Sequence, residues 1–168
     1  MTSLQTARLA LRPQTQDDAP ALFTILSDPE AMRFWNRPAI PRLEIVEELL
    51  RGQQAAMADG LCRYWTLVEN GDAIGSVDLS LIEGGSAELG FLLRRDRWGA
   101  GLATEAAAAA VGFGLGALGL TRLAAAAQRD NRGATRVLEK NGFKLVESRP
   151  VLLADGTRRD CDFYLLTK

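Results

Sequence analysis

The sequence contains no histidine and only two cysteines, Cys62 and Cys161, among its 168 residues. Without an imidazole, a Ser-His or Cys-His nucleophile is excluded. The two cysteines lie far apart in the chain and lack C-x-x-C spacing, so we expect no zinc site or other metal centre. Two isolated thiols are typical of a reducing compartment, and we therefore expect a cytoplasmic protein.

The chain also lacks an excess of either charge and any long hydrophobic run. Its 20 Lys and Arg residues nearly balance 21 Asp and Glu residues, for a net charge of −1. The longest run of small apolar residues, 106–120, is interrupted by glycines and is too short to span a bilayer. The first residues also lack the basic and apolar regions of a signal peptide. We therefore expect neither nucleic acid nor a membrane as a partner.

Hydrophobic periodicity predicts an α/β chain of a length that fits one domain, residues 1–168. A segment rich in aromatics and proline, 32–41, is expected to be a loop or short helix. Asn70-Gly71 is a strong hairpin turn, and Gly84-Gly85 and Asp155-Gly156 mark further turns. Strands are predicted at 7–13, 64–69, 73–81, 87–93, 120–127, 143–147 and 162–166, and helices at 15–28, 43–58, 101–117 and 134–141.

The segment after the strand ending at Leu93 has the clearest functional pattern. It is a basic, glycine-centred turn, Arg94-Arg-Asp-Arg97-Trp98-Gly99-Ala100-Gly101, from which an alanine-rich helix opens directly. A helix N-terminus offers unpaired N–H groups and a partial positive charge, which suit a phosphate. Gly99 and Gly101 let the backbone approach a ligand closely, and Arg94, Arg95 and Arg97 add positive charge. The turn therefore predicts an anion site.

Three kinds of phosphate loop could explain this turn. A P-loop requires Lys followed by Ser or Thr after its last glycine, and no such pair follows Gly101. A dinucleotide-binding fingerprint requires a small residue at its third glycine position, which is Thr104 here, and usually lies near the start of a domain. The third kind is the pyrophosphate loop of the GNAT acetyltransferases, Gln/Arg-x-x-Gly-x-Gly/Ala, whose last two small positions match Gly101 and Ala103.

The chain resembles the GNAT superfamily in three segments, and within it the RimJ/RimL-like branch. Trp98-Gly-x-Gly-x-Ala-Thr-Glu105-Ala is similar to that branch's loop, with Trp98 where most GNAT proteins have Gln or Arg. Asn131-Arg-Gly-Ala134-Thr-Arg136-Val-Leu138-Glu-Lys140-Asn-Gly142-Phe143 resembles its Asn-x-x-Ser-x-x-Val-x-Glu-Lys-x-Gly-Phe segment, and Thr6-Ala-Arg8-Leu-Ala-Leu-Arg12-Pro resembles its first strand. The resemblance covers about residues 6–166. It implies the α/β (α+β) GNAT fold, a single central mixed, mostly antiparallel sheet flanked by about four helices.

The resemblance also implies acetyl-CoA as cosubstrate and direct transfer of its acetyl group to a bound primary amine. The N–H groups of Gly99 to Thr104 would hold the pyrophosphate, and the strand Phe91–Leu93 would pair with the pantetheine arm where it is splayed from 123–127. A backbone N–H near Leu92 or Leu93 would stabilise the developing oxyanion. The expected acetyl-CoA site comprises Phe91, Leu92, Leu93, Arg94, Arg97, Trp98, Gly99, Ala100, Gly101, Leu102, Ala103, Thr104, Asn131 and Arg136.

Two of these residues have an ordinary structural alternative. Asn131 can simply cap the helix that follows it, or it can also hydrogen-bond the pantetheine arm. Arg136 can contact the cofactor's phosphates or remain solvated.

The amine must lose a proton before it attacks, and with no histidine the base must be another group. Glu88, at the start of the central strand, is the first candidate, although it could equally be a solvated residue after a turn. Asp78 and Glu83 are weaker candidates, and each could act through water. Phe34 and Trp35 either wall the acceptor slot or belong to the core. The resemblance therefore suggests Phe34, Trp35 and Asp78 as acceptor-side residues.

The general acid of related enzymes has no counterpart in this sequence. The tyrosine that protonates the departing thiolate in several relatives corresponds to Leu138, and the serine implicated in the RimL-like branch corresponds to Ala134. Water, Tyr164 or Cys161 could substitute, and a thiolate also leaves without help at neutral pH.

Two functions therefore stay open. The first is an N-acetyltransferase acting on a protein N-terminus or a small-molecule amine, and the second is a non-catalytic acyl-CoA-binding sensor domain. A homodimer is suggested only by analogy with relatives.

Overall fold

The computed structural model describes residues 2–154 and 156–168 and contains one eight-stranded sheet. The strands lie in the order β1-β2-β3-β4-β5-β6-β8-β7, and every neighbouring pair is antiparallel except β5 and β6. The mixed, mostly antiparallel sheet confirms the predicted fold class. The strands are β1 (Leu4–Gln5), β2 (Ala10–Pro13), β3 (Arg63–Glu69), β4 (Asp72–Glu83), β5 (Ser86–Leu93), β6 (Arg122–Gln128), β7 (Lys144–Leu152) and β8 (Arg158–Thr167).

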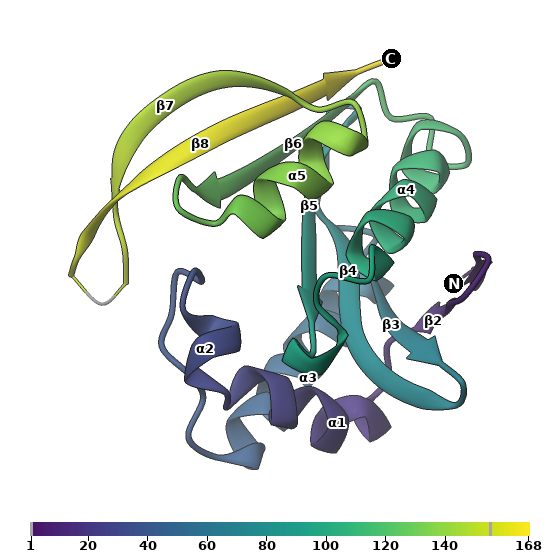
Figure 1. The fold of residues 1–168 in the computed structure, drawn as a ribbon. Helices are drawn as coiled ribbons and strands as arrows, with labels where there is room; N and C mark the ends of the chain where they lie inside the picture. The colour runs from purple at the N-terminus through teal and green to yellow at the C-terminus, as the bar shows by residue number, and fades with distance from the viewer. Residues whose placement is uncertain (1, 155) are drawn as a thin grey trace.

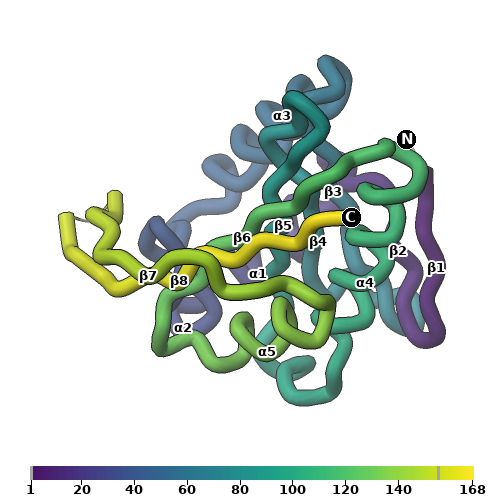
Figure 2. The backbone as a smooth tube through the Cα atoms, turned by 90° about the horizontal axis from the view of Figure 1, so that it is seen from above, coloured from purple at the N-terminus to yellow at the C-terminus, as the bar shows by residue number. Residues whose placement is uncertain are grey.

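Helices cover both faces of this sheet (Figures 1 and 2). One face packs on α4 (Leu102–Leu115) and α5 (Arg132–Lys140), and the other packs on α1 (Ala19–Leu26), α2 (Pro29–Met32) and α3 (Leu43–Ala58). Two short 3₁₀ helices, η1 (Gln16–Asp18) and η2 (Arg95–Arg97), precede α1 and α4 in the chain. The β7–β8 ribbon arches outward beyond β6 (Figure 1).

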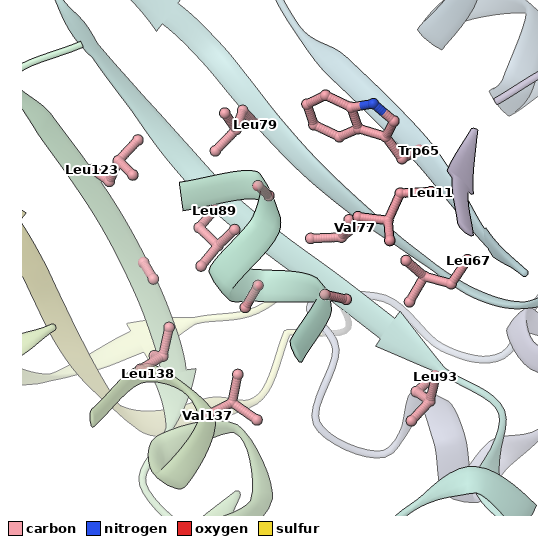
Figure 3. Close-up of a cluster of buried hydrophobic side chains, with 14 of the residues drawn as sticks. Leu11, Trp65, Leu67, Val77, Leu79, Leu89, Leu93, Leu123, Val137 and Leu138 are labelled. Atoms are coloured by element: carbon pink, nitrogen blue, oxygen red, sulfur yellow. The ribbon is translucent and has the colours of Figure 1, made fainter. Parts of the chain in front are cut away.

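The main core lies between the sheet and α4 (Figure 3). Alternate strand positions such as Trp65, Val77 and Leu79 point to this face and are fully buried. The helix meets them with small side chains, and Ala106 and Ala110 are fully buried as well. Because alanine adds so little bulk, α4 lies close to the strands, and this fixes where its N-terminus sits relative to β5.

The parallel pair β5–β6 is short, and the two strands then separate. Register partners are Ser86 with Arg122, Ala87 with Leu123 and Glu88 with Ala124. Beyond these positions β5 continues to its end without β6, while β6 pairs only with β8. In Figure 1 β5 runs downward from the junction while β6 runs to the left. We call the opening between β5 after Glu88 and β6 after Ala124 the fork.

The elements differ from the sequence prediction in the N-terminal half where local hydrogen bonds override periodicity. The strand predicted at 7–13 begins only at Ala10, because the Thr6 N–H donates to the Leu9 carbonyl and the Thr6 hydroxyl accepts from the Leu9 N–H, which makes a turn between β1 and β2. The helix predicted at 15–28 is observed as η1 and α1 and ends at Leu26, just before Asp28-Pro29, as expected; the Asp28 carboxylate then accepts from the Glu30 N–H and starts the short α2, which was not predicted. The structure accordingly has five α-helices in its described residues rather than about four.

The last hairpin is longer than the sequence pattern predicted. β7 extends to Leu152 rather than ending at 147, and β8 begins at Arg158 rather than 162. Nearly every residue of β7 is exposed, so the strand shows no alternation of apolar and polar side chains from which its length could be read. Of the predicted turn, Gly156 has φ +80°, and Asp155 lies outside the described residues.

Candidate active site at the fork

The glycine turn, residues 98–101, presents an open helix N-terminus at the end of β5. Gly99 and Gly101 have φ of +78° and +79°, which strongly favours glycine, and a Cβ at Gly99 would meet no atom within 4 Å. Gly101 is the N-cap of α4 and has no side chain to satisfy the first N–H groups of the helix. Within the described residues, the N–H groups of Leu102, Ala103 and Thr104 accordingly stay free. The turn therefore offers an anion three donors and the positive end of a helix dipole.

Arg8 braces this turn from the N-terminal segment. Its Nη1 donates to the Ala100 carbonyl at 2.8 Å. Its backbone N–H donates to Oε1 of Glu105 and its Nε donates to Oε2, both at 2.8 Å. The Thr6 hydroxyl also donates to Glu105. Burial alone would raise the pKa of Glu105, but the hydrogen bonds from Thr6 and Arg8 outweigh it and lower that pKa. This role of Arg8 could not be predicted from the sequence, because its partners lie more than 90 residues away.

Trp98 ties the turn to the end of β5. Its indole Nε1 donates to the Leu93 carbonyl at 2.8 Å, and its side chain is half-exposed. The indole N–H is therefore occupied within the protein and is not available to a ligand. This contact gives a local reason for a tryptophan where most GNAT proteins have Gln or Arg.

The arginines of the turn are paired with carboxylates. Arg94 lies 2.7 Å from Asp96, Arg97 lies 3.0 Å from Glu69, and Arg95 lies 3.2 Å from Asp28. Each guanidinium stays partly in solvent. Their positive charge is therefore largely compensated locally, and a phosphate contact from Arg94 or Arg97 would have to share the guanidinium with its acid.

The backbone of β5 has free groups facing the fork. The Arg94 N–H donates to the Ile74 carbonyl of β4, so in the alternating antiparallel ladder the peptide groups of Leu92 also face β4. Those of Phe91 and Leu93 face the opposite way, into the fork. The Leu93 carbonyl is taken by the indole of the glycine turn, which leaves the Leu93 N–H as a donor. Of the two predicted positions, Leu93 rather than Leu92 offers an available N–H.

Two carboxylates lie on the other face of the sheet, at the base of the fork. Asp78 sits directly over Gly90, because a Cβ on Gly90 would lie 2.5 Å from the Asp78 Oδ1. Burial raises the pKa of Asp78 to about 7, a hydrogen bond from Ser80 opposes that shift, and the charge of Glu88 adds to it. Glu88 is exposed on the same face, opposite Ser80 in the ladder. The structure thus places the predicted first candidate at the surface and the weaker candidate, Asp78, in a buried site.

The segment after α2 reaches the open end of the fork. The Trp35 carbonyl accepts from Gln128 Nε2 at 3.5 Å, where β6 ends. The Trp35 side chain packs against the second apolar cluster, formed by α1, α2 and α3. Phe34 is half-buried and lies under the Arg33 guanidinium, 5.0 Å from its ring centre. Trp35 therefore lies at the end of β6, beside the fork, while its ring belongs to the second apolar cluster.

The second motif positions α5 beside the glycine turn. Asn131 is the N-cap of α5, and its Oδ1 accepts from the Ala134 N–H at 3.1 Å. At the other end of the helix, Asn141 Nδ2 donates to the Thr104 carbonyl at 3.3 Å in the first turn of α4. Arg136 is exposed on α5 and has no ion-pair partner among the described residues. The helix is thus docked next to the first turn of α4, with one guanidinium open to solvent.

The positions of the missing general acid are filled by apolar side chains. Leu138 is buried in the main core, and Ala134 packs against it. Tyr164 is buried in the same core, and burial raises the pKa of the Cys161 thiol. Among the described residues, no helix combines the length and hydrophobicity that crossing a bilayer requires, and no cluster of three His, Cys, Asp or Glu side chains could hold a metal ion.

Comparisons with known proteins agree with this architecture. A family model described as Acetyltransferase (GNAT) domain matches residues 8–144. The uncharacterized N-acetyltransferase YoaA of Bacillus subtilis (strain 168) is 28% identical over 170 residues, which cover 98% of this chain and 96% of that protein.

Solved structures share the fold at lower identity. RimL, a ribosomal L7/L12 alpha-N-protein acetyltransferase in complex with coenzyme A, superposes with a TM-score of 0.90 at 18% identity, over 99% of this chain and 98% of that one. A spermidine N-acetyltransferase from Vibrio cholerae, in complex with CoA and spermine, superposes with a TM-score of 0.84 at 19% identity, over 96% of each chain.

Proposed function

Because the chain belongs to the GNAT acetyltransferase family, we propose that it is an acetyl-CoA-dependent N-acetyltransferase that transfers acetyl directly to a primary amine. The observation that carries this proposal is the fork, which opens beside a helix N-terminus with free N–H groups. The neighbours that share the fold are described as acting on a protein N-terminus and on spermidine, so we propose either a protein N-terminus or a small-molecule amine as the acceptor.

Acetyl-CoA would supply the acetyl thioester, and the chain's own groups would hold and orient it. The N–H groups from Gly99 to Thr104, of which those of Leu102, Ala103 and Thr104 are free in the described residues, suit its pyrophosphate. The edge of β5 at Phe91 and Leu93 offers peptide groups for the pantetheine arm. The Leu93 N–H is the donor available to the thioester oxygen as negative charge develops on it. Asn131 and Arg136 stay candidates for additional contacts with the cosubstrate.

We propose that the carboxylate pair of Asp78 and Glu88 accepts the amine's proton. A primary amine is largely protonated at neutral pH, because its pKa is about 10 for an alkyl amine and about 7.7–8.0 for a protein N-terminus, and only the neutral form attacks. Glu88 at the surface attracts the cation, and Asp78, with a pKa of about 7, can take its proton directly or through water. The new N–C bond forms as the C–S bond breaks, and the thiolate leaves without a dedicated acid.

The first experiment is calorimetric binding of acetyl-CoA, followed by thiol release with a panel of N-terminal peptides, amino acids and polyamines. We expect binding and amine-dependent thiol release. Binding without release over the whole panel would favour a non-catalytic acyl-CoA sensor, and the absence of binding would refute the proposed donor.

The pH dependence of kcat/KM assigns the base. Activity should rise with pH through the pKa of Asp78, about 7, because that carboxyl must be ionised to accept a proton. The charge of Glu88 raises this pKa, so Glu88→Gln should move the acidic limb to lower pH, whereas Asp78→Asn should abolish the limb and most of the turnover. The reverse pattern, with turnover lost in Glu88→Gln and retained in Asp78→Asn, would make Glu88 the base.

A further inference from the structure

A groove of about 800 Å³ runs between α3 and the strands β3 and β4, on the same face of the sheet as the two carboxylates. Its walls are mostly apolar, with Leu49 from α3 and Leu61 and Leu81 from the opposite side. Two acidic side chains, Glu48 and Glu83, also line it. The groove is therefore large enough for a small organic molecule and complementary to one that is apolar along its length and positively charged.

A β-bulge in β4 shapes this groove. The β4–β5 register shifts between Ser80 and Glu83, and Leu81 has φ +50°, a left-handed conformation that costs a leucine about 1–2 kcal/mol. The Ile82 N–H donates to the Leu61 carbonyl at 2.9 Å and holds the bulge against the loop after α3. As a result, Leu61 is 54% exposed and Leu81 68% exposed. Strained backbone and exposed leucines at one place are typical of a ligand site rather than of a folding requirement.

The groove leads to the proposed base. Ser80 and Tyr64 both line it, and both adjoin Asp78: Ser80 lies two residues along β4 on the same face, and Tyr64 is the register partner of Asp78 on β3. Glu88 lies opposite Ser80 on β5. A molecule in the groove would therefore direct one end toward the carboxylates at the base of the fork.

We propose that this groove binds the body of the acceptor, an aliphatic amine with a second cationic group at its far end. The reacting amine lies at the Asp78 end, the methylenes contact Leu49, Leu61 and Leu81, and the distal cation lies near Glu48 and Glu83. This assignment rests on the proposed N-acetyltransferase function and adds to it the site and chemical class of the acceptor.

Gly52 provides a direct test, because it lines the groove from α3 and a Cβ built on it meets no atom within 4 Å. Gly52→Leu therefore fills the groove without a clash at Cβ, and leucine favours a helix more than glycine does. Gly112→Leu is the matched control. Gly112 is also a helical glycine with no atom within 4 Å of its Cβ, but it lies on α4, away from the groove.

The probes are methylamine, butylamine, octylamine and 1,8-diaminooctane, each assayed by thiol release with acetyl-CoA. For wild type we expect kcat/KM to rise up to about fourfold per methylene buried, and 1,8-diaminooctane to exceed octylamine. Glu83→Gln should reduce the preference for the diamine. Gly52→Leu should lower the ratio of kcat/KM for 1,8-diaminooctane to that for methylamine at least about tenfold, whereas Gly112→Leu should leave that ratio unchanged.

The two proposals fail in different ways. If wild type acetylates these amines and Gly52→Leu leaves the ratio unchanged, the groove assignment is overturned and the enzymatic function stands. If wild type releases no thiol with any of these amines, calorimetric binding of 1,8-diaminooctane tests the groove without turnover. Binding that Gly52→Leu abolishes would then support the groove, and no binding to wild type would overturn it.

Discussion

Replacing Arg8 with alanine should weaken acetyl-CoA binding while leaving the fold intact. Arg8 holds the Ala100 carbonyl of the glycine turn and neutralises Glu105, which lies in the first turn of α4. Hydrogen bonds lower the pKa of Glu105, so its carboxylate is charged at neutral pH. Without Arg8, this negative charge would stand uncompensated beside the groups that we propose bind the pyrophosphate.

The expected magnitude follows from the charges and their exposure. The Arg8 side chain is 46% exposed, so its ion pair should contribute only about 0.5–1 kcal/mol to the free energy of unfolding. For binding, two unit negative charges about 8 Å apart repel by about 0.5 kcal/mol at an effective dielectric of 80 and by about 2 kcal/mol at 20. We therefore expect the Kd for acetyl-CoA to rise about 2- to 30-fold, and the difference to shrink at high salt.

Calorimetric titration of acetyl-CoA measures this effect, and two further variants interpret it. Arg8→Ala combined with Glu105→Gln should recover most of the affinity if charge compensation dominates. Arg12→Ala is the control, because Arg12 lies in the same N-terminal segment, is 42% exposed and pairs with the buried Asp18 far from the glycine turn. A Kd unchanged within twofold in Arg8→Ala, or an equal rise in Arg12→Ala, would refute this role for Arg8.

Three further substitutions test other contacts. Gly90→Ala should destabilise the fold by about 1–3 kcal/mol, because the new Cβ would lie 2.5 Å from Asp78; an unchanged urea midpoint would contradict that packing. Trp98→Phe removes the indole donor to the last carbonyl of β5 and should lower the free energy of unfolding by about 0.5–1.5 kcal/mol in urea melts, whereas an equal stability would show that water replaces it. Burial opposes the ionisation of Asp18, but hydrogen bonds led by the one from Arg12 outweigh burial and lower the pKa of Asp18 in the folded protein. The ionised Asp18 therefore stabilises the fold above its unfolded pKa of about 3.9, and this stabilisation is lost as pH falls through the lower pKa of the folded state. Asp18→Asn should flatten this acid dependence in melts between pH 6 and 2, and an identical slope in the variant would count against it.

The elements that depend on local pattern could be predicted from the sequence. Helix α3 spans residues 43–58, as its apolar spacing predicted, and the Asn70-Gly71 turn has both residues at positive φ. These features arise from side chains a few residues apart, which is the range over which periodicity and turn preferences act. The β7–β8 ribbon was predicted too short because an exposed strand has no apolar alternation.

The candidate site was predictable only in part. The glycine turn and its helix N-terminus were evident from the glycine spacing. Trp98 stood out because most GNAT proteins have Gln or Arg at this position, but its hydrogen bond to Leu93 could not be predicted. Glu88 and Asp78 illustrate the limit. Both are acids on predicted strands, and the sequence favoured Glu88, but only the packed structure shows that Asp78 is the buried one and has its pKa raised to about 7. Residue spacing in the sequence does not report burial of this kind.

The sequence by itself determined most of the order of elements, the glycine turn before α4 and the family, because each is encoded in short segments whose preferences act locally. Only the tertiary structure decided the environments of the chemical groups. Arg8 reaches a glutamate 97 residues away, β5 and β6 separate after three paired positions, and a bulge at Leu81 opens a groove toward Asp78. Desolvation, ion pairing and cavity shape depend on which distant segments pack together, and that information is spread over the whole chain rather than held in any one motif.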